Sequence, residues 1–124
     1  MEFRTCRRHW GAEFISDDVV RFRVWAEGQK DLTLRLTDTD IPMAAVGDGW
    51  FQVDVPGVRH GTPYQFVLQD GMAVPDPASR AQQADVNGPS VVIDPRHNLP
   101  AQREWQGRPW EETVIYEMHI GTFT

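Results

Sequence analysis

Four segments of the chain alternate apolar and polar side chains with a period of two: residues 19–25, 31–37, 50–55 and 62–69. Because successive side chains of a β-strand point to opposite faces, this period predicts strands with one buried face. The residues predicted to face the core are Val20, Phe22, Val24, Leu32, Leu34, Leu36, Phe51, Val53, Val55, Tyr64, Phe66 and Leu68. Such strands are typical of antiparallel sheets that cover a core with one face.

Turn-forming residues separate these segments. Gly-Asp-Gly at residues 47–49 precedes the third segment and Asp70-Gly71 follows the fourth, and these residues tolerate the positive φ that tight hairpins require. Short strands at this spacing, without a convincing helix, predict an all-β fold, namely an immunoglobulin-like (E-set) β-sandwich. The single cysteine, Cys6, excludes the internal disulfide of antibody-type domains.

The net charge of the chain and its apolar runs indicate which classes of binding partner to expect. The chain has 12 Lys and Arg against 18 Asp and Glu, a net charge of -6. Because nucleic-acid binding needs clustered cations, we expect no nucleic-acid partner. We also expect no membrane partner, since no apolar run approaches the roughly 20 residues of a spanning helix. With one cysteine and no secretory signal, we expect a cytoplasmic protein without a cofactor or a metal site.

The composition changes after residue 74. Prolines stand at positions 75, 77, 89, 95 and 100, and little alternation remains. Ser and Gly are too few for a flexible linker, so we expect an irregular connector over residues 75–109, after a sandwich module over residues 1–74. Near its start, Asp76 and Pro77 predict a single helical turn capped by Asp76.

The last segment has a different pattern. Residues 113–123 form a nearly continuous apolar run, which is typical of a strand buried on both faces of a parallel sheet. Such a strand needs neighbours, so residues 110–124 are predicted to begin a further, truncated domain. In the chain alone we expect this segment to stay unpaired or to form an edge-strand dimer with a second copy.

Several motifs together resemble the maltooligosyltrehalose trehalohydrolases, glycoside hydrolases of the α-amylase superfamily. The most specific are Pro-Asp-Pro-Ala-Ser-Arg at 75–80 and His-Ile-Gly-Thr-Phe-Thr at 119–124. The other matching segments are residues 9–14, 20–26, 48–51, 87–90 and 107–118. One departure is Glu27, which stands where the family commonly has Pro after a Trp-Ala pair; it loosens a turn without removing a chemical group.

This resemblance implies an N-terminal module of an enzyme that cleaves the α-1,4 bond next to the trehalose end of maltooligosyl trehalose. Retaining hydrolysis of this kind uses two carboxyl groups about 5 Å apart. In the superfamily these groups lie on later strands of a (β/α)8 barrel, so the resemblance implies no catalytic residue in this chain. It also implies that residues 110–124 begin the barrel, and that the barrel is the main partner of the sandwich.

Four tryptophans are candidates for contact with glycan or with the barrel. Trp25 and Trp50 fall on the polar faces of their strands, where they could stack on glucose rings or be covered by the barrel or the connector. We favour the covered interpretation, because a large exposed aromatic side chain usually marks an interface. A bulge after Gly49 that turns Trp50 inward stays open. We expect Trp105 and Trp110 to pin the connector to the barrel.

Charged residues give further candidates for the cleft rim or an interface. Asp76 and Arg80 are either a substrate-facing pair or, as we favour, residues that pair with each other or fix the connector. Glu117 and His119 share one face of the predicted last strand, whose C-terminal end would approach the mouth of a barrel active site. The remaining histidines stand apart from other metal ligands and are expected at the surface: His9, His60 and His97.

Two rival functions stay open. A free-standing starch- or glycogen-binding module would use Trp25 and Trp50 as its platform, with α-glucan or maltooligosyl trehalose as ligand. Alternatively, the same module could belong to a glycogen debranching or branching enzyme. The first rival predicts glycan affinity that is lost when the two tryptophans are replaced, by about 1–3 kcal/mol if the rings stack as aromatic side chains stack on bases.

Overall fold

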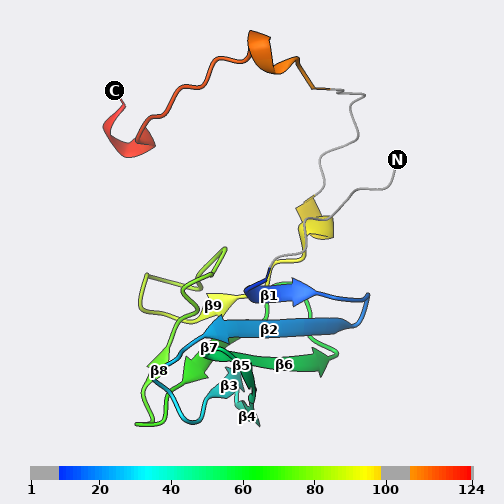
Figure 1. Ribbon diagram of the computed structural model, residues 1–124, viewed down its shortest axis with the longest axis vertical. Helices are drawn as coiled ribbons and strands as arrows, with labels where there is room; N and C mark the ends of the chain where they lie inside the picture. The colour runs from blue at the N-terminus through cyan, green and yellow to red at the C-terminus, as the bar shows by residue number, and fades with distance from the viewer. Residues whose placement is uncertain (1–8, 99–106, 124) are drawn as a thin grey trace.

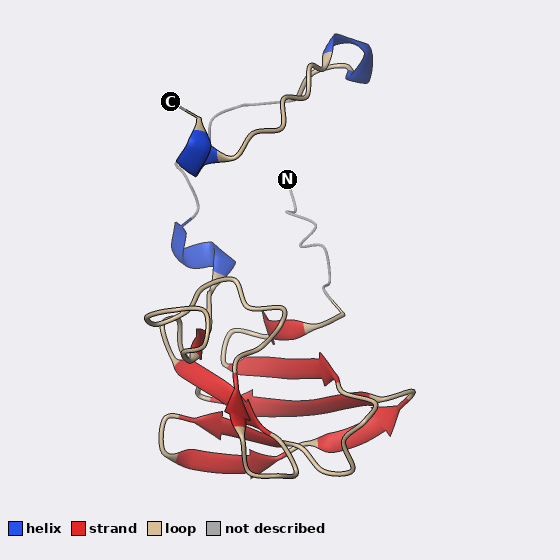
Figure 2. Ribbon diagram, turned by 90° about the vertical axis from the view of Figure 1, so that its left-hand side faces the viewer, coloured by secondary structure: helices blue, strands red, loops and turns tan. Residues whose placement is uncertain are grey.

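The computed structural model describes residues 9–98 and 107–123. Within these residues, nine strands form two antiparallel sheets (Figures 1 and 2). The first sheet has, in spatial order, β1 (Gly11–Phe14), β2 (Val19–Trp25), β6 (Trp50–Pro56) and β5 (Ala44–Gly47). The second has β4 (Thr39–Pro42), β3 (Thr33–Leu36), β7 (Pro63–Val67) and β8 (Ala73–Val74), with β9 (Ser90–Val91) also paired to β7.

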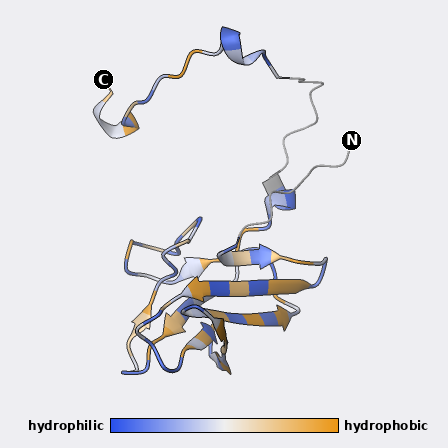
Figure 3. Cartoon of the chain, viewed as in Figure 1, coloured by the Kyte–Doolittle hydropathy of each residue, from blue (hydrophilic) through white to orange (hydrophobic). Residues whose placement is uncertain are grey.

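The predicted strands are confirmed, and the two longest are β2 and β6. They pair over their full lengths, and the alternation of β2 between hydrophobic and hydrophilic residues is visible in Figure 3. The strands β3 and β7 are shorter than the segments 31–37 and 62–69 that predicted them. At Thr37, for example, φ is 51°, a left-handed conformation that ends β3 and turns the chain into β4.

The core lies between the two sheets. Its fully buried large side chains include Phe22 from β2, Leu34 from β3 and Phe66 from β7. The Phe22 and Tyr64 rings meet edge to face across the sandwich, with centroids 4.9 Å apart at an angle of 66°. Burial of a side chain such as Phe22 stabilises the fold by about 1.5–3 kcal/mol, so these inward-facing residues hold the sheets together.

Two glycine-containing turns connect neighbouring strands as predicted. In the turn between β5 and β6, Gly47, Asp48 and Gly49 all have positive φ (97°, 51° and 78°). A Cβ at Gly49 would lie 2.8 Å from both the Glu27 Cβ and the Trp25 Nε1 atoms, so this turn packs closely against the end of β2. The second turn, at Asp70-Gly71, joins β7 to β8.

The sandwich core includes residues on both sides of the predicted boundary at residue 74. Strand β9 pairs with β7, and Val92, directly after β9, is completely buried among the core residues. Asp76 and Ser90 are the buried polar residues of the described chain. The segment from 75 to 92 is therefore anchored to the second sheet at both of its ends.

Residues 113–123, predicted as the first strand of a further domain, form no strand in this structure. Residues 113–119 are extended without strand pairing, between the 3-10 helices η2 (Trp110–Glu112) and η3 (Ile120–Thr122). Every described residue from 107 to 123 is exposed. A strand buried on both faces requires a neighbouring strand and covering layers, and the described residues supply neither to this segment.

A third 3-10 helix, η1 (Pro95–Asn98), follows β9. In the portion of the chain covered by the structure, no helix has the length and apolar character needed to cross a bilayer. In the same portion, no three His, Cys, Asp or Glu side chains gather in a way that could hold a metal ion.

Candidate functional site

The outer face of the first sheet carries the two tryptophans that the sequence singled out. Trp25 and Trp50 are directly opposite each other on β2 and β6. Neither is turned into the core: the irregularity in this region lies in β5, between Ala45 and Gly47, and not after Gly49. We call Arg23, Trp25 and Trp50 the aromatic face.

Side chains of the aromatic face already make contacts within the chain. Trp25 is 55% exposed, and its indole Nε1 donates a hydrogen bond to the Asp48 carbonyl at 3.0 Å. The Arg23 guanidinium carbon lies 4.6 Å from the centre of the Trp50 ring, so the cation covers one face of that ring. The Arg23 Nε is buried and makes no hydrogen bond to any described residue. One aromatic ring of the pair is therefore partly covered and the other is open.

Further along the same outer face, the side chains are charged. Arg21 and Asp54 form a two-pronged ion pair across β2 and β6, with both N–O distances at 2.8 Å. The hydrogen bonds from Arg21 lower the pKa of Asp54, and those to Asp54 raise the pKa of Arg21. The outer face of the first sheet thus has a charged end and an aromatic end.

Asp76 is the centre of a buried polar cluster. It is 3% exposed, and its Oδ2 accepts a hydrogen bond from the Tyr64 hydroxyl at 2.7 Å. Its Oδ1 accepts one from the Ala78 N–H at 2.8 Å, and its own N–H donates to the Ser90 Oγ at 2.9 Å. Burial raises the pKa of Asp76, although the bonds from Tyr64 and Ala78 oppose this rise. Burial, with the charge of Asp76, also raises the pKa of Tyr64.

This cluster places Asp76 inside the molecule rather than on a surface that could meet substrate. Residues 76–79 form a β-turn closed by a 3.0 Å hydrogen bond from the Ser79 N–H to the Asp76 carbonyl, so the predicted helical turn is wrong. The side chain does cap the turn, but it also ties the turn to β7. Arg80 is exposed, and its positive charge counteracts part of the rise in the Tyr64 pKa.

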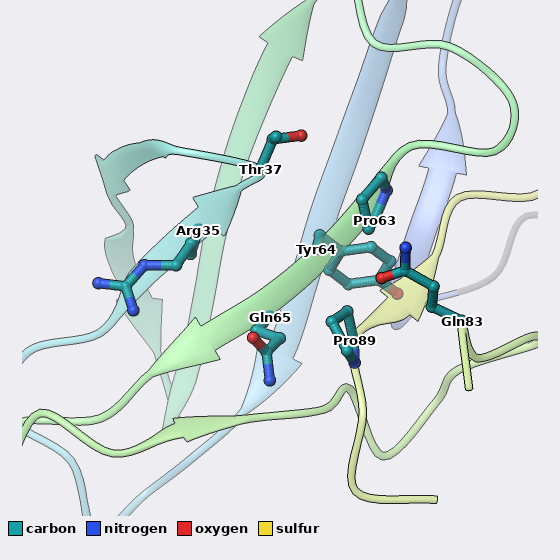
Figure 4. Close-up of a pocket in the computed structure, with 7 residues that line it drawn as sticks. All are labelled: Arg35, Thr37, Pro63, Tyr64, Gln65, Gln83 and Pro89. Carbon is teal, nitrogen blue, oxygen red and sulfur yellow. The ribbon is translucent and has the colours of Figure 1, made fainter. Parts of the chain in front are cut away.

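A small pocket lies on the outer face of the second sheet, beside β7 (Figure 4). Its volume is about 260 Å³. We call it the β7 pocket, and it is lined by Arg35, Thr37, Pro63, Tyr64, Gln65, Gln83 and Pro89. Arg35 and Gln65 are cross-strand neighbours on β3 and β7, whereas Gln83 and Pro89 come from the loop before β9. The sequence alone did not predict this pocket, because its lining residues come from segments that are far apart in the sequence.

Two histidines that were predicted to stand apart are in fact stacked. The His60 and His97 rings are 4.1 Å apart and nearly parallel, with an interplanar angle of 14°. His60 Nδ1 accepts a 3.1 Å hydrogen bond from the Asp94 N–H, and Arg96 binds both Asp94 and Asp17. These contacts fix the chain where it leaves the sandwich. The spacing of 37 residues between the two histidines hides this contact from sequence patterns.

The remaining predicted site residues come after the sandwich in the sequence. Trp105 lies outside the described residues. Trp110 begins η2 and is 76% exposed. Glu117 and His119 are also exposed, and the Nδ1 atom of His119, the residue before η3, is 3.3 Å from the Thr122 Oγ1. Trp110, Glu117 and His119 are therefore exposed side chains in the described part of the chain.

Comparison with known proteins finds relatives that cover most of this chain. No protein-family model matches it. However, the malto-oligosyltrehalose trehalohydrolase of Saccharolobus solfataricus is 37% identical over 111 residues, which are 89% of this chain and 20% of the relative. This chain is a homologue of malto-oligosyltrehalose trehalohydrolases. The resemblance that the sequence motifs indicated is thereby confirmed.

Two other similar proteins have different names. A crystal structure of an alpha amylase candidate from Salmonella typhimurium matches with a TM-score of 0.84 and 59% identity, over 95% of this chain and 20% of that chain. The 1,4-alpha-glucan branching enzyme of Nitrobacter winogradskyi is 34% identical over 66% of this chain and 12% of its own length. The chain thus spans about a fifth of the trehalohydrolases that it matches.

Proposed function

We propose that this chain is the non-catalytic N-terminal module of a glycoside hydrolase that cleaves the α-1,4 bond next to the trehalose end of maltooligosyl trehalose. In this proposal the sandwich is of the immunoglobulin-like E-set class, docks on the catalytic (β/α)8 barrel of its own protein and shapes the rim of the substrate cleft. The proposal includes a cytoplasmic role in trehalose biosynthesis. Its support is the homology to enzymes named for this activity, of which the chain spans about a fifth.

The observation that carries the docking role is the exposed apolar surface after the sandwich. Large apolar side chains are exposed throughout this segment: Trp110, Val114, Ile115, Tyr116, Met118, Ile120 and Phe123. Soluble monomers rarely leave such a continuous apolar surface in water, because burying it against another surface is favourable. We propose that residues 110–123 begin the barrel of the whole protein, whose other strands bury them, and that in the chain alone they stay unpaired or pair with a second copy.

The aromatic face fits docking better than glycan binding. A sugar platform needs open ring faces, but Arg23 already covers one face of Trp50, and only Trp25 remains widely exposed. The chemistry of hydrolysis would come from the barrel, since Asp76, the buried carboxylate among the described residues, is held by Tyr64 and Ala78.

A chimera tests this proposal. The region of the Saccharolobus solfataricus trehalohydrolase that matches this chain is replaced by residues 1–124. We expect the chimera to hydrolyse maltooligosyl trehalose and the 124-residue chain to show no hydrolysis. In the chimera, Trp25→Ala should lower the thermal midpoint more than Trp10→Ala does, because Trp10 is similarly exposed (57% against 55%) but lies outside the aromatic face.

The rival binding function has a distinct outcome. The isolated chain is titrated with maltoheptaose while heat and tryptophan fluorescence are recorded. Docking predicts no saturable change in tryptophan fluorescence at millimolar sugar, because no sugar stacks on Trp25 or Trp50. Saturable binding that Trp25→Ala abolishes and Trp10→Ala leaves intact would refute the docking role and establish an α-glucan-binding module.

A further inference from the structure

The β7 pocket is built by three separate parts of the second sheet. Its floor is the outer side of β7, where Pro63 and Gln65 point away from the core because their neighbours Tyr64 and Phe66 are buried in it. One wall is Arg35 on β3, directly across from Gln65. The other wall is the loop that carries Gln83 and Pro89 (Figure 4).

The loop wall is held in place by its own hydrogen bonds. The Gln83 N–H donates to the Pro89 carbonyl at 2.9 Å, and the Gln82 side-chain amide donates to the Val86 carbonyl at 2.9 Å. The loop is joined to β7 through β9, where Ser90 pairs with Tyr64. A preformed wall of this kind does not have to be ordered when a ligand binds, which favours affinity.

The lining of the pocket specifies the chemistry of its ligand. Gln65 and Gln83 each carry an amide that can donate and accept hydrogen bonds, and the Thr37 hydroxyl can do both as well. Pro63 and Pro89 add apolar ring faces. A polyhydroxylated ring matches this combination, because each of its hydroxyl groups donates and accepts while its C–H faces are apolar.

Other ligand classes fit less well. Arg35 is the charged residue of the lining, and Asp40 already binds it in two-pronged fashion, with both N–O distances at 2.7 Å. An anionic ligand would need an unpaired cation. A flat apolar ligand would leave the two glutamine amides without partners. The volume of about 260 Å³ lies below the roughly 300–1,000 Å³ that is usual for pockets of drug-sized ligands, so it suits a single ring.

We propose that the β7 pocket is a binding site for one neutral sugar ring, on the face of the sandwich opposite the aromatic face. This inference goes beyond the proposed function: it requires no barrel and uses none of the tryptophans. It assigns to the second sheet a ligand contact that is independent of docking.

The test is an NMR titration of the 124-residue chain with trehalose and with maltose, with inorganic phosphate as a charged probe. We expect saturable shifts of the amide signals of Gln65, Gln83 and their neighbours with a sugar and none with phosphate. Gln65→Ala and Gln83→Ala should each weaken binding by about three- to tenfold, as expected for one lost hydrogen bond. The fold of each variant is checked by its unchanged core signals.

Gln52→Ala is the matched control, because Gln52 lies on the outer face of the other sheet, opposite Arg23. It should leave sugar binding unchanged. The proposal is overturned if neither sugar produces saturable shifts, if phosphate binds in place of sugar, or if the shifts fall on the Trp25 and Trp50 indoles. The last outcome would also count against docking, whereas the first two would leave the docking proposal intact.

Discussion

The sandwich and the segment after it have similar apolar content, but the apolar side chains are buried in the sandwich and exposed in the segment. In β2 the apolar residues Val20, Phe22 and Val24 alternate with polar ones, and all three are buried. In residues 113–123 the apolar residues Val114, Ile115 and Tyr116 are consecutive, and every apolar residue of the segment is exposed. The difference shows that hydrophobicity alone does not bury a segment: the pattern must match a partner that the same chain supplies.

The largest expected effect compares one phenylalanine from each region. Phe22→Ala should lower the free energy of unfolding by about 3–5 kcal/mol, because it removes a fully buried ring that contacts Tyr64. Phe123→Ala should change it by less than about 0.5 kcal/mol, since Phe123 is exposed. Urea unfolding followed by circular dichroism measures both, and equal losses would show that residues 107–123 pack on the sandwich.

A smaller effect is expected at the turn beside Trp25. Gly49→Ala should destabilise the chain by about 2–4 kcal/mol, because alanine is strained at the φ of 78° and its Cβ would clash with Glu27 and Trp25.

Gly57→Ala is the matched control for this turn. Its φ of 75° imposes the same strain, but no atom lies within 4 Å of the added Cβ. Thermal unfolding should therefore give a smaller loss for Gly57→Ala. If the two variants lose equal stability, the close packing of the turn against β2 contributes nothing.

The smallest effect concerns the pH dependence that Asp76 imposes on the sandwich. Burial raises the pKa of Asp76 above 3.8 in the folded chain, so as pH rises the unfolded chain releases this proton first. The wild type should therefore lose stability relative to Asp76→Asn as pH rises from about 3.8 to the raised pKa. At pH 3 the variant should be about 1 kcal/mol less stable than the wild type, because the asparagine amide nitrogen replaces one of the two oxygens that accept hydrogen bonds. This difference should shrink as pH rises.

Urea unfolding from pH 3 to pH 8, carried out on both proteins, measures this difference. Differences between wild type and variant cancel the contributions of Asp54 and Asp94, whose pKa values are lowered by Arg21 and Arg96. Stability curves that stay parallel over the whole pH range would show that Asp76 titrates as it does in the unfolded chain.

The fold could be predicted where an element depends only on residues that are close together in the sequence. The alternation over residues 19–25 and the Asp70-Gly71 turn are local patterns, and both predicted the observed elements. The candidate sites were harder, because their contacts join distant residues. Tyr64 was assigned to the core from its period alone, which could not reveal the hydrogen bond to Asp76. The His60–His97 stack and the β7 pocket were missed for the same reason.

The sequence by itself determined the all-β class, the faces of the strands, the hairpin turns and, through its motifs, the homology to trehalohydrolases. Only the tertiary structure decided that Asp76 is buried, that Arg23 covers Trp50, and that the loop before β9 forms a wall beside β7. Side-chain direction along a strand follows from the chirality and pleat of the backbone, so it can be read locally. Burial and contact between distant segments depend on how the two sheets pack, which no local pattern contains.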